Sequence, residues 1–215
     1  NDLMSMGVHR AWKAAFLNRI ALRADMKVLD VAGGTGDIAF RIREKARPRT
    51  AITVCDINAE MLQVGKARAI DRGILGPEAG IRWVCGDAEA IPAPDSFYDV
   101  YTIAFGLRNV TDIPAALADA RRVLRPGGQF LCLEFSQVVL PVLDDIYDRY
   151  SFSVLPKLGR YVARDEDAYR YLAESIRKFP NQDTLASMMA EAGLEHVKVQ
   201  NLSSGIAAIH TARRI

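Results

Sequence analysis

The chain has 215 residues, half of them apolar and a quarter charged, and its 28 basic and 26 acidic residues leave a net charge of +2. At about 150 residues per domain, this composition predicts one globular domain and excludes disordered or repetitive sequence. No uncharged apolar run reaches the length of a membrane-spanning helix, about 18 residues. Charges of both signs are interspersed, which disfavours nucleic acid as a partner. The three cysteines lie apart in apolar runs, as expected of reduced core thiols rather than of disulfides or a zinc site.

Apolar patterns and turn residues predict that strands alternate with helices as far as residue 136. In chain order we expect helix 3–22, strand 27–32, helix 37–47, strand 51–57, helix 58–72, strands 81–85 and 98–105, helix 112–125 and strand 130–135. Pro126-Gly127-Gly128 is expected to break the last of these helices. Because the strands are almost continuously apolar, we expect a parallel sheet with helices on both faces and ligands at the carboxyl ends of its strands.

The pattern changes after Ser136, because nearly sixty residues precede the next strand-like run at 197–202. This insertion contains five of the seven tyrosines: Tyr147, Tyr150, Tyr161, Tyr169 and Tyr171. Two compatible interpretations are a helical layer with its own aromatic core and a lid over a large, flat, apolar substrate. A second run at 206–212 follows after Ser203-Ser204-Gly205, which is hairpin spacing and predicts an antiparallel last strand.

A glycine-rich segment, residues 30–37, follows the first predicted strand. Gly34-x-Gly36-x-x-Ala39 satisfies a relaxed dinucleotide fingerprint, but such a match alone is weak. Asp37 stands at the entrance of the next helix, where a pyrophosphate would need neutral or positive surroundings. A ligand with an ammonium and a sulfonium would favour a carboxylate there, so the segment favours S-adenosylmethionine over a nicotinamide cofactor.

Acidic residues follow the next two strands. Asp56 ends the second strand, where a carboxylate can accept both ribose hydroxyls. Met61, one turn into the following helix, can pack on an adenine face, although a role in the core is equally consistent with its position. Asp87 and Ala88 follow the third strand and suit the exocyclic amine of adenine; a turn-stabilising aspartate is the alternative.

Arg108 and Asn109 follow the fourth strand, within Phe105-Gly106-Leu107-Arg108-Asn109-Val110, and Glu134 closes the fifth. A solvated arginine is the ordinary expectation on a loop, but its position at the ligand-binding edge favours contact with substrate. His210 is a candidate general base for the reaction, although a histidine in a terminal strand is more often structural.

These residues resemble the ubiquinone/menaquinone-biosynthesis C-methyltransferase family (2-methoxy-6-polyprenyl-1,4-benzoquinol methylase type), over essentially the whole chain. The resemblance rests on residues 1–5, 9–13, 30–37, 105–110, 122–128, 133–136, 150–152 and 171–177. It implies a single domain with the seven-stranded, mostly parallel Rossmann-like sheet of class I S-adenosylmethionine-dependent methyltransferases. In this arrangement an N-terminal helix (3–22) precedes the nucleotide-binding core (27–136), a helical substrate insertion (about 137–193) precedes strand six, and a C-terminal hairpin (196–213) carries the antiparallel last strand.

The resemblance implies S-adenosylmethionine as methyl donor, without a metal, and a polyprenylated benzoquinol as acceptor. Arg108 is expected to stabilise the phenolate and Asn109 to orient an oxygen; since a guanidinium keeps its proton, Arg108 is disfavoured as the direct base. The expected cofactor-binding residues are Asp30, Gly33, Gly34, Thr35, Gly36, Asp56, Ile57, Met61, Asp87, Ala88 and Ala104. Ala104 departs from bacterial members of the family, which carry serine there.

Three alternatives stay open: a demethylmenaquinol methyltransferase, a same-fold N- or O-methyltransferase for small molecules or proteins, and a non-catalytic quinone-binding protein. Expected partners are the polyprenyl quinol, a multiprotein complex of quinone biosynthesis, a membrane surface contacted transiently and a second copy of the chain. The expected location is the bacterial cytoplasm, peripheral to the inner membrane, with the matrix side of the mitochondrial inner membrane as the alternative.

Overall fold

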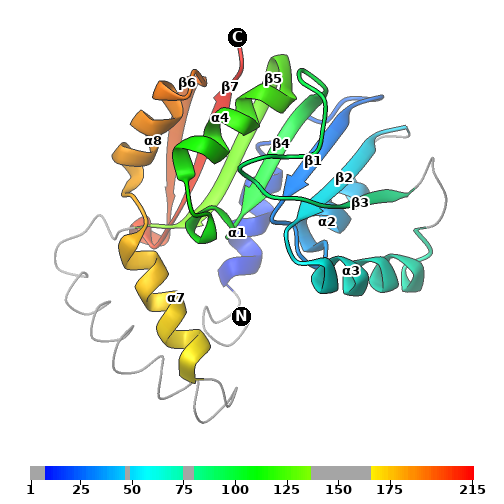
Figure 1. Cartoon of the computed structure of the whole chain (residues 1–215), viewed down its shortest axis with the longest axis horizontal. Coiled ribbons are helices and arrows are strands. Elements are labelled where there is room, and N and C mark those ends of the chain that lie inside the picture. The colour runs from blue at the N-terminus through cyan, green and yellow to red at the C-terminus, as the bar shows by residue number, and fades with distance from the viewer. Residues whose placement is uncertain (1–7, 47–48, 75–79, 137–165) are drawn as a thin grey trace.

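A computed structural model describes residues 8–46, 49–74, 80–136 and 166–215. Seven strands form one sheet in the order β3-β2-β1-β4-β5-β7-β6 (Figure 1). Their bounds are β1 Lys27–Val31, β2 Ala51–Asp56, β3 Ile81–Cys85, β4 Tyr98–Ala104, β5 Leu124–Phe135, β6 Glu195–Leu202 and β7 Ala207–Arg213. All neighbouring pairs are parallel except the two that include β7. The predicted mostly parallel α/β sheet with an antiparallel last strand is therefore confirmed.

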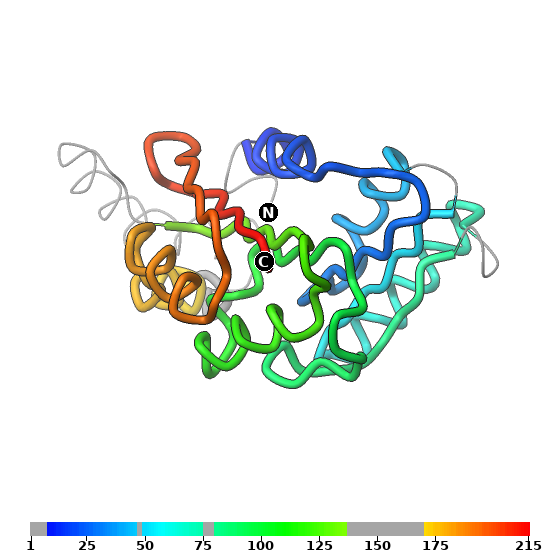
Figure 2. The backbone as a smooth tube through the Cα atoms, turned by 90° about the horizontal axis from the view of Figure 1, so that it is seen from above, coloured from blue at the N-terminus to red at the C-terminus, as the bar shows by residue number. Residues whose placement is uncertain are grey.

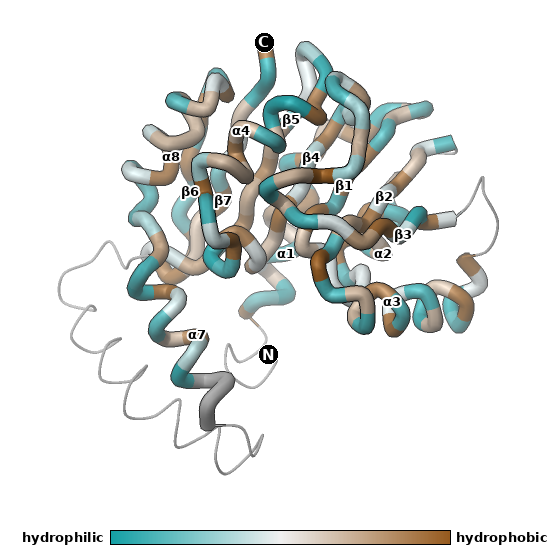
Figure 3. The backbone as a smooth tube through the Cα atoms, viewed as in Figure 1, coloured by the Kyte–Doolittle hydropathy of each residue, from teal (hydrophilic) through white to brown (hydrophobic). Residues whose placement is uncertain are grey.

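Helices cover both faces of this sheet (Figure 2). The helices are α1 Val8–Leu17, α2 Asp37–Lys45, α3 Ala59–Asp71, α4 Ile113–Val123, α7 Glu166–Lys178 and α8 Gln182–Glu191, with short 3-10 turns η1 Leu107–Asn109 and η4 Ser203–Gly205. One apolar core lies between the sheet and α1, α2 and α3, and the other between the sheet and α4 and α8. In Figure 3 apolar residues follow the central strands, whereas hydrophilic and apolar residues alternate along helices such as α3.

Side-chain caps explain where the helices begin. The Asn58 side chain accepts hydrogen bonds from the Glu60 and Met61 amides at the start of α3, and Asp112 accepts one from Ala115 at the start of α4. Such caps satisfy amides that have no partner within the helix. Because both caps are local in sequence, the starts of these helices were predicted within one residue.

The connection between α4 and β5 differs from the prediction. The helix ends at Val123, two residues early, and Pro126-Gly127-Gly128 lies within β5 instead of outside it. Tyr98 pairs with Leu124 but Val100 pairs with Gln129, so residues 125–128 bulge out opposite one residue of β4. The Arg214 guanidinium donates to the carbonyls of Arg121, Arg122 and Leu124, and so satisfies the end of the helix from a distant part of the chain.

The flanking segments are described in part. The helix predicted over 3–22 is observed from Val8 to Leu17, and residues 1–7 lie outside the described residues. Most of the predicted insertion, including Tyr147, Tyr150 and Tyr161, also lies outside them; its described part forms α7 and α8. None of the described helices is both long and apolar enough to cross a membrane.

Candidate active site

The carboxyl ends of β1 to β5 meet at one edge of the sheet, and strand order reverses there between β1 and β4. This is the position at which open α/β sheets bind ligands. The predicted residues from Asp30 to Asn109 lie at the ends of these strands or in the turns that follow them, except Met61, which lies in the first turn of α3. The structure therefore brings them to one edge, as the sequence pattern predicted.

The turn after β1 requires glycine. Gly34 and Gly36 have φ values of 52° and 82°, a conformation that favours glycine. A Cβ on Gly33 would lie 2.7 Å from Val54 Cγ1 and 2.9 Å from Asp30 Oδ2. The backbone of this turn therefore lies directly against the buried carboxylate.

Asp30 is buried beneath that turn. Its Oδ1 accepts a hydrogen bond from Thr102 Oγ1 at 2.8 Å, and its Oδ2 has no partner among the described residues. Burial raises the pKa of Asp30 from 3.8 to about 7, against the lowering effect of the Thr102 bond. An unpartnered, buried carboxylate oxygen next to a glycine turn suits a ligand that brings positive charge.

Asp56 ties the end of β2 to the glycine turn. Its Oδ2 accepts from the Gly34 amide and its Oδ1 from the Asn58 amide, both at 2.8 Å. Each carboxylate oxygen keeps a further lone pair, so ligand hydroxyls can still be accepted. Ile57 and Met61, 70% and 41% exposed, place apolar surface beside this carboxylate.

Asp87 and Ala88 follow β3. Asp87 is exposed and its Oδ1 accepts from the Glu89 amide at 3.0 Å, the bond expected of a turn-stabilising aspartate. Its other oxygen is uncommitted within the described part of the chain, so this turn and a ligand contact are compatible. Ala88 is buried against the α4 side of the sheet.

Two polar residues of the glycine turn have partners that the sequence did not indicate. Asp37 accepts from Lys13 Nζ at 2.8 Å and Arg41 Nε at 3.2 Å. Burial opposes its ionisation, but the two cations hold the pKa of Asp37 below its usual value. Asp37 is therefore ionised, and it shares its negative charge with Lys13 and Arg41. Thr35 Oγ1 likewise accepts from Arg68 at 2.6 Å.

The segment after β4 carries Arg108 and Asn109 on η1. Arg108 Nη1 lies 2.8 Å from Glu134 Oε1, in an ion pair whose side chains are 11% and 1% exposed. One edge of the Arg108 guanidinium therefore faces a buried carboxylate, and its contact with substrate stays a prediction. Ala104 ends β4, and Phe105 beyond it has a φ of 57°, unusual for a bulky residue.

Helix α7 lies at the same edge, below the ends of β4 and β5 in Figure 1. It packs against η1, and the Tyr171 hydroxyl donates to Asn109 Oδ1 at 3.2 Å. An aromatic group of Trp12, Phe105 and Phe135 lies nearby, with ring centroids 4.9 to 6.4 Å apart. The described part of the insertion thus places a tyrosine against Asn109, and its role as a lid stays a prediction.

His210 does not reach this edge. It pairs with Cys132 in the middle of the sheet, three positions from the Ala207–Phe135 pair, or about 10 Å along the strand. Its Nε2 contacts the Gln182 carbonyl at 3.0 Å, and burial lowers its pKa. The structural interpretation of His210 fits, and its role as a base does not.

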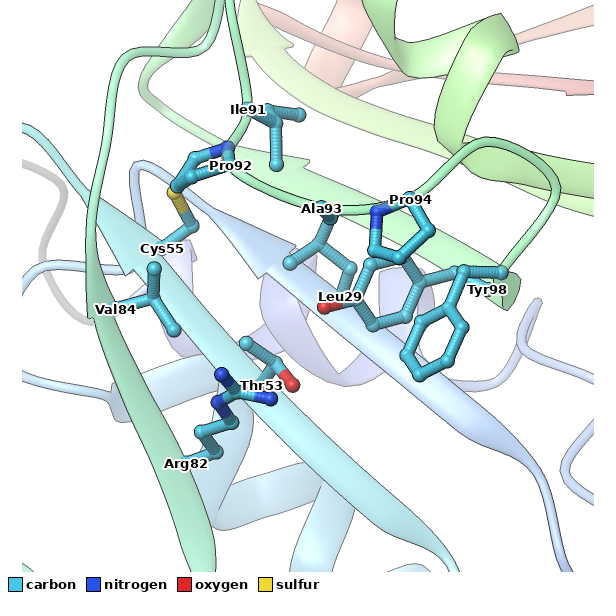
Figure 4. A pocket seen from close by; sticks show the side chains of 11 residues that line it. Leu29, Thr53, Cys55, Arg82, Val84, Ile91, Pro92, Ala93, Pro94 and Tyr98 are labelled. Atoms are coloured by element: carbon cyan, nitrogen blue, oxygen red, sulfur yellow. The ribbon is translucent and has the colours of Figure 1, made fainter.

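A cavity of about 250 Å³ lies elsewhere, between β1–β3 and the segment that leads into β4 (Figure 4). Leu29, Thr53 and Val84 line its floor, and Pro92 and Pro94 cover it. None of the predicted site residues lines it. Within the described residues, no group of three or more His, Cys, Asp or Glu side chains is arranged to hold a metal ion.

Sequence reasoning missed two features of the site. Glu134 was noted only as a strand end, although a carboxylate in a strand as apolar as β5 signals a buried partner. Trp83 was not singled out, yet its ring would lie 2.5 Å from a Cβ on Gly36 and 2.3 Å from one on Gly65. These two glycines let the indole pack between the start of α2 and the middle of α3, and no local pattern indicates that contact.

Comparisons with known proteins agree with this architecture. Residues 1–214 match the ubiE/COQ5 methyltransferase family. "Ubiquinone/menaquinone biosynthesis C-methyltransferase UbiE" of Paracoccus denitrificans is 55% identical over 216 residues, which cover 100% of this chain and 84% of that protein. "2-methoxy-6-polyprenyl-1,4-benzoquinol methylase, mitochondrial" of Arabidopsis thaliana is 50% identical over 230 residues, covering 100% and 80%.

Among solved structures, a SAM-dependent methyltransferase from Aquifex aeolicus has a TM-score of 0.69 and 15% identity, over 94% of this chain and 89% of that chain. At such low identity the likeness establishes the fold alone. The predicted Rossmann-like fold of class I S-adenosylmethionine-dependent methyltransferases is confirmed.

Proposed function

We propose a function from one premise: the chain belongs to the ubiE/COQ5 methyltransferase family. The proposed reaction is transfer of a methyl group from S-adenosylmethionine to a ring carbon of a polyprenylated benzoquinol, 2-methoxy-6-polyprenyl-1,4-benzoquinol. The observation that carries this proposal is the 50% identity, over the whole chain, to a plant protein with that substrate in its name.

The residues around the glycine turn fit the methyl donor. The turn leaves no room for a side chain at Gly33, and Asp30 Oδ2 beneath it is buried without a partner among the described residues. We assign Asp30, the turn from Gly33 to Gly36, and Asp56 to holding the donor, with Ile57, Met61, Asp87, Ala88 and Ala104 around its nucleoside. When bound, S-adenosylmethionine supplies a methyl group already activated by its sulfonium.

The chain's own task is then to orient the quinol and promote its ionisation. A phenolic oxygen that loses its proton makes the ortho ring carbon a far better nucleophile. The Arg108 guanidinium stabilises the phenolate, and Asn109, held by Tyr171, orients an oxygen. Transfer would break the methyl–sulfur bond and leave S-adenosylhomocysteine as the co-product. Loss of the ring proton from the methylated carbon to water restores aromaticity.

Demethylmenaquinol is a second acceptor to be tested, because the Paracoccus relative is named for both quinone pathways. The polyprenyl tail of either quinol partitions into a bilayer. We therefore propose transient contact with a membrane surface, on the cytoplasmic side of a bacterial inner membrane or the matrix side of the mitochondrial one. A complex with other enzymes of quinone biosynthesis, and a homodimer, belong to the same proposal.

One reaction tube tests the function. It contains the protein, S-adenosylmethionine, a reductant and short-tail demethylated benzoquinol and naphthoquinol, and mass spectrometry follows the products. A one-methyl gain on the benzoquinol ring carbon is expected, and a gain on oxygen or nitrogen, or on neither acceptor, would contradict the proposal. Omission of the reductant should abolish the reaction, since a quinone is not a nucleophile.

Arg108→Met tests the assignment of the guanidinium. It should abolish turnover and leave the affinity for S-adenosylhomocysteine unchanged, because Arg108 lies on η1, outside the glycine turn. Full activity in this variant would exclude Arg108 from the reaction. A loss of S-adenosylhomocysteine binding instead would place Arg108 in the donor site.

A further inference from the structure

The Arg108–Glu134 pair removes two charges from solvent at the edge of the sheet. Burial raises the pKa of Glu134, against the lowering effect of Arg108. Buried ion pairs contribute little net stability, because desolvation offsets their attraction, and apolar replacements are often as stable. The pair is therefore better explained by what it positions than by what it stabilises.

The Glu134 carboxylate accepts three hydrogen bonds from its neighbours. Its Oε2 accepts from the Arg108 backbone amide at 3.3 Å. Its Oε1 accepts from Arg108 Nη1 at 2.8 Å and from the Phe135 amide at 2.9 Å. One carboxylate thus fixes both the main chain of η1 and the guanidinium relative to the end of β5.

The other edge of the guanidinium is uncommitted. Arg108 Nη1 also donates to the Phe105 carbonyl, and the guanidinium carbon lies 5.5 Å from the centroid of the Phe135 ring. Nε has no hydrogen-bond partner, and no hydrogen bond within the described part of the chain uses Nη2. Donors on the side away from Glu134 are therefore left for a ligand oxygen.

We propose that Glu134 is a positioning residue for methyl transfer: acting through Arg108, it fixes the guanidinium so that its uncommitted donors face the ionising oxygen of the quinol. This inference rests on the proposed function. Glu134 also moderates the positive charge that Arg108 presents. Loss of the Glu134 charge therefore has two separable effects, a loosened guanidinium that slows transfer and a more positive site that stabilises the phenolate at lower pH.

The test compares Glu134→Gln with the wild-type protein across pH 6 to 9.5, at saturating S-adenosylmethionine and with reduced short-tail benzoquinol. We expect kcat to fall about 10- to 100-fold, and KM for S-adenosylmethionine to stay within about twofold. The rising limb of kcat, which reports ionisation of the bound quinol, should move down by at least about half a pH unit. A purely structural role would scale the whole profile and leave the limb in place.

Other titratable groups are common to both proteins, so only the difference between the two profiles matters. Asp30 titrates at the same edge. The charge of Glu134 contributes to the raised pKa of the Cys132 thiol on the same strand. Helix α7 carries the exposed side chains of Arg170 and Glu174 where it packs near η1.

Asp99→Asn is the matched control. Asp99 is also a buried carboxylate of the same sheet, paired with Arg125 and accepting from the Lys27 amide, but it lies at the start of β4, at the opposite edge. This variant should lower the melting temperature while leaving kcat and the limb unchanged. A limb that moves equally in Asp99→Asn and Glu134→Gln would overturn the proposal.

Two further variants keep the proposal testable if Glu134→Gln does not fold. Glu134→Asp keeps the charge but shortens the reach, so kcat should fall while the limb stays at its wild-type pH. In an Arg108→Lys background either change at Glu134 should cost less than about twofold, because its effect passes through Arg108. Undiminished effects in that background, or full kcat in Glu134→Asp, would overturn the positioning role. A wild-type protein that methylates neither quinol would overturn the proposed function and this role with it.

Discussion

Asp30 provides a test, without any substrate, of the edge of the sheet where the carboxyl ends of β1 to β5 meet. Its side chain is 1% exposed, one oxygen has no partner among the described residues, and burial raises its pKa from 3.8 to about 7. Between those two pH values, the folded protein keeps a proton on Asp30 that the unfolded chain has released. The free energy of unfolding therefore falls as pH rises, because ionisation of Asp30 is easier in the unfolded state.

The size of this effect follows from the two pKa values. Each pH unit between 3.8 and about 7 removes up to about 1.4 kcal/mol, so the whole window removes about 4 kcal/mol. Below that window the effect is fully absent, and above it the loss is complete. Asn at this position cannot ionise, so Asp30→Asn should lack this part of the pH dependence.

Urea unfolding of the wild-type and Asp30→Asn proteins between pH 4.5 and 8 measures the difference. Asn also places an amide nitrogen against Gly33, which adds a cost of about 1–3 kcal/mol that does not depend on pH. The slope of the difference against pH, rather than its offset, is therefore the measurement. The variant should gain on the wild type by several kcal/mol as pH rises, and a difference that stays flat would refute the buried, unpartnered state of Asp30.

Three further predictions concern packing, pH and helix α7. Gly65→Ala should lower the free energy of unfolding by about 1–2 kcal/mol, despite a better helix former in α3, because its Cβ would lie 2.3 Å from Trp83; a more stable variant in urea would contradict this contact. His210→Asn should remove a loss of stability below pH 6.5, since burial lowers the pKa of His210 and the unfolded state takes up the proton first; identical pH profiles of the melting temperature would show that His210 is not buried. Tyr171→Phe should raise KM for the quinol about two- to tenfold and leave KM for S-adenosylmethionine unchanged, because the bond to Asn109 is lost; an unchanged KM for the quinol would separate α7 from the substrate site.

Local pattern was enough to predict where most elements lie and which strand ends carry the site. Strands as apolar as 98–104 can only be buried on both faces, and caps such as Asn58 signal helix starts within a few residues. From those facts the sheet edge that gathers Asp30, Asp56 and Arg108 follows without knowledge of any side-chain contact.

The contacts that decide charge were not predictable in this way. Lys13 neutralises Asp37 from 24 residues earlier, and Glu134 meets Arg108 across 26 residues, distances over which periodicity carries no information. The bulge in β5 was also not predictable from the local sequence. Pro126-Gly127-Gly128 is typical of a break, but the carbonyls at the end of α4 accept hydrogen bonds from Arg214, which lies 90 residues after Leu124. The expected class of ligand does not depend on Asp37 alone, because Asp56 and Asp87 indicate it as well.

The order of the last strands has a consequence for how the chain folds during synthesis. β7 follows β6 in the sequence but lies between β5 and β6 in the sheet. Until β7 has left the ribosome, β6 therefore has no partner strand and β5 is paired on its β4 side alone. Until then β5, the strand that carries Glu134, is an apolar edge open to pairing with other nascent chains. Ribosome-bound intermediates that lack β7 are therefore the species most prone to aggregation, and those on which a chaperone would act.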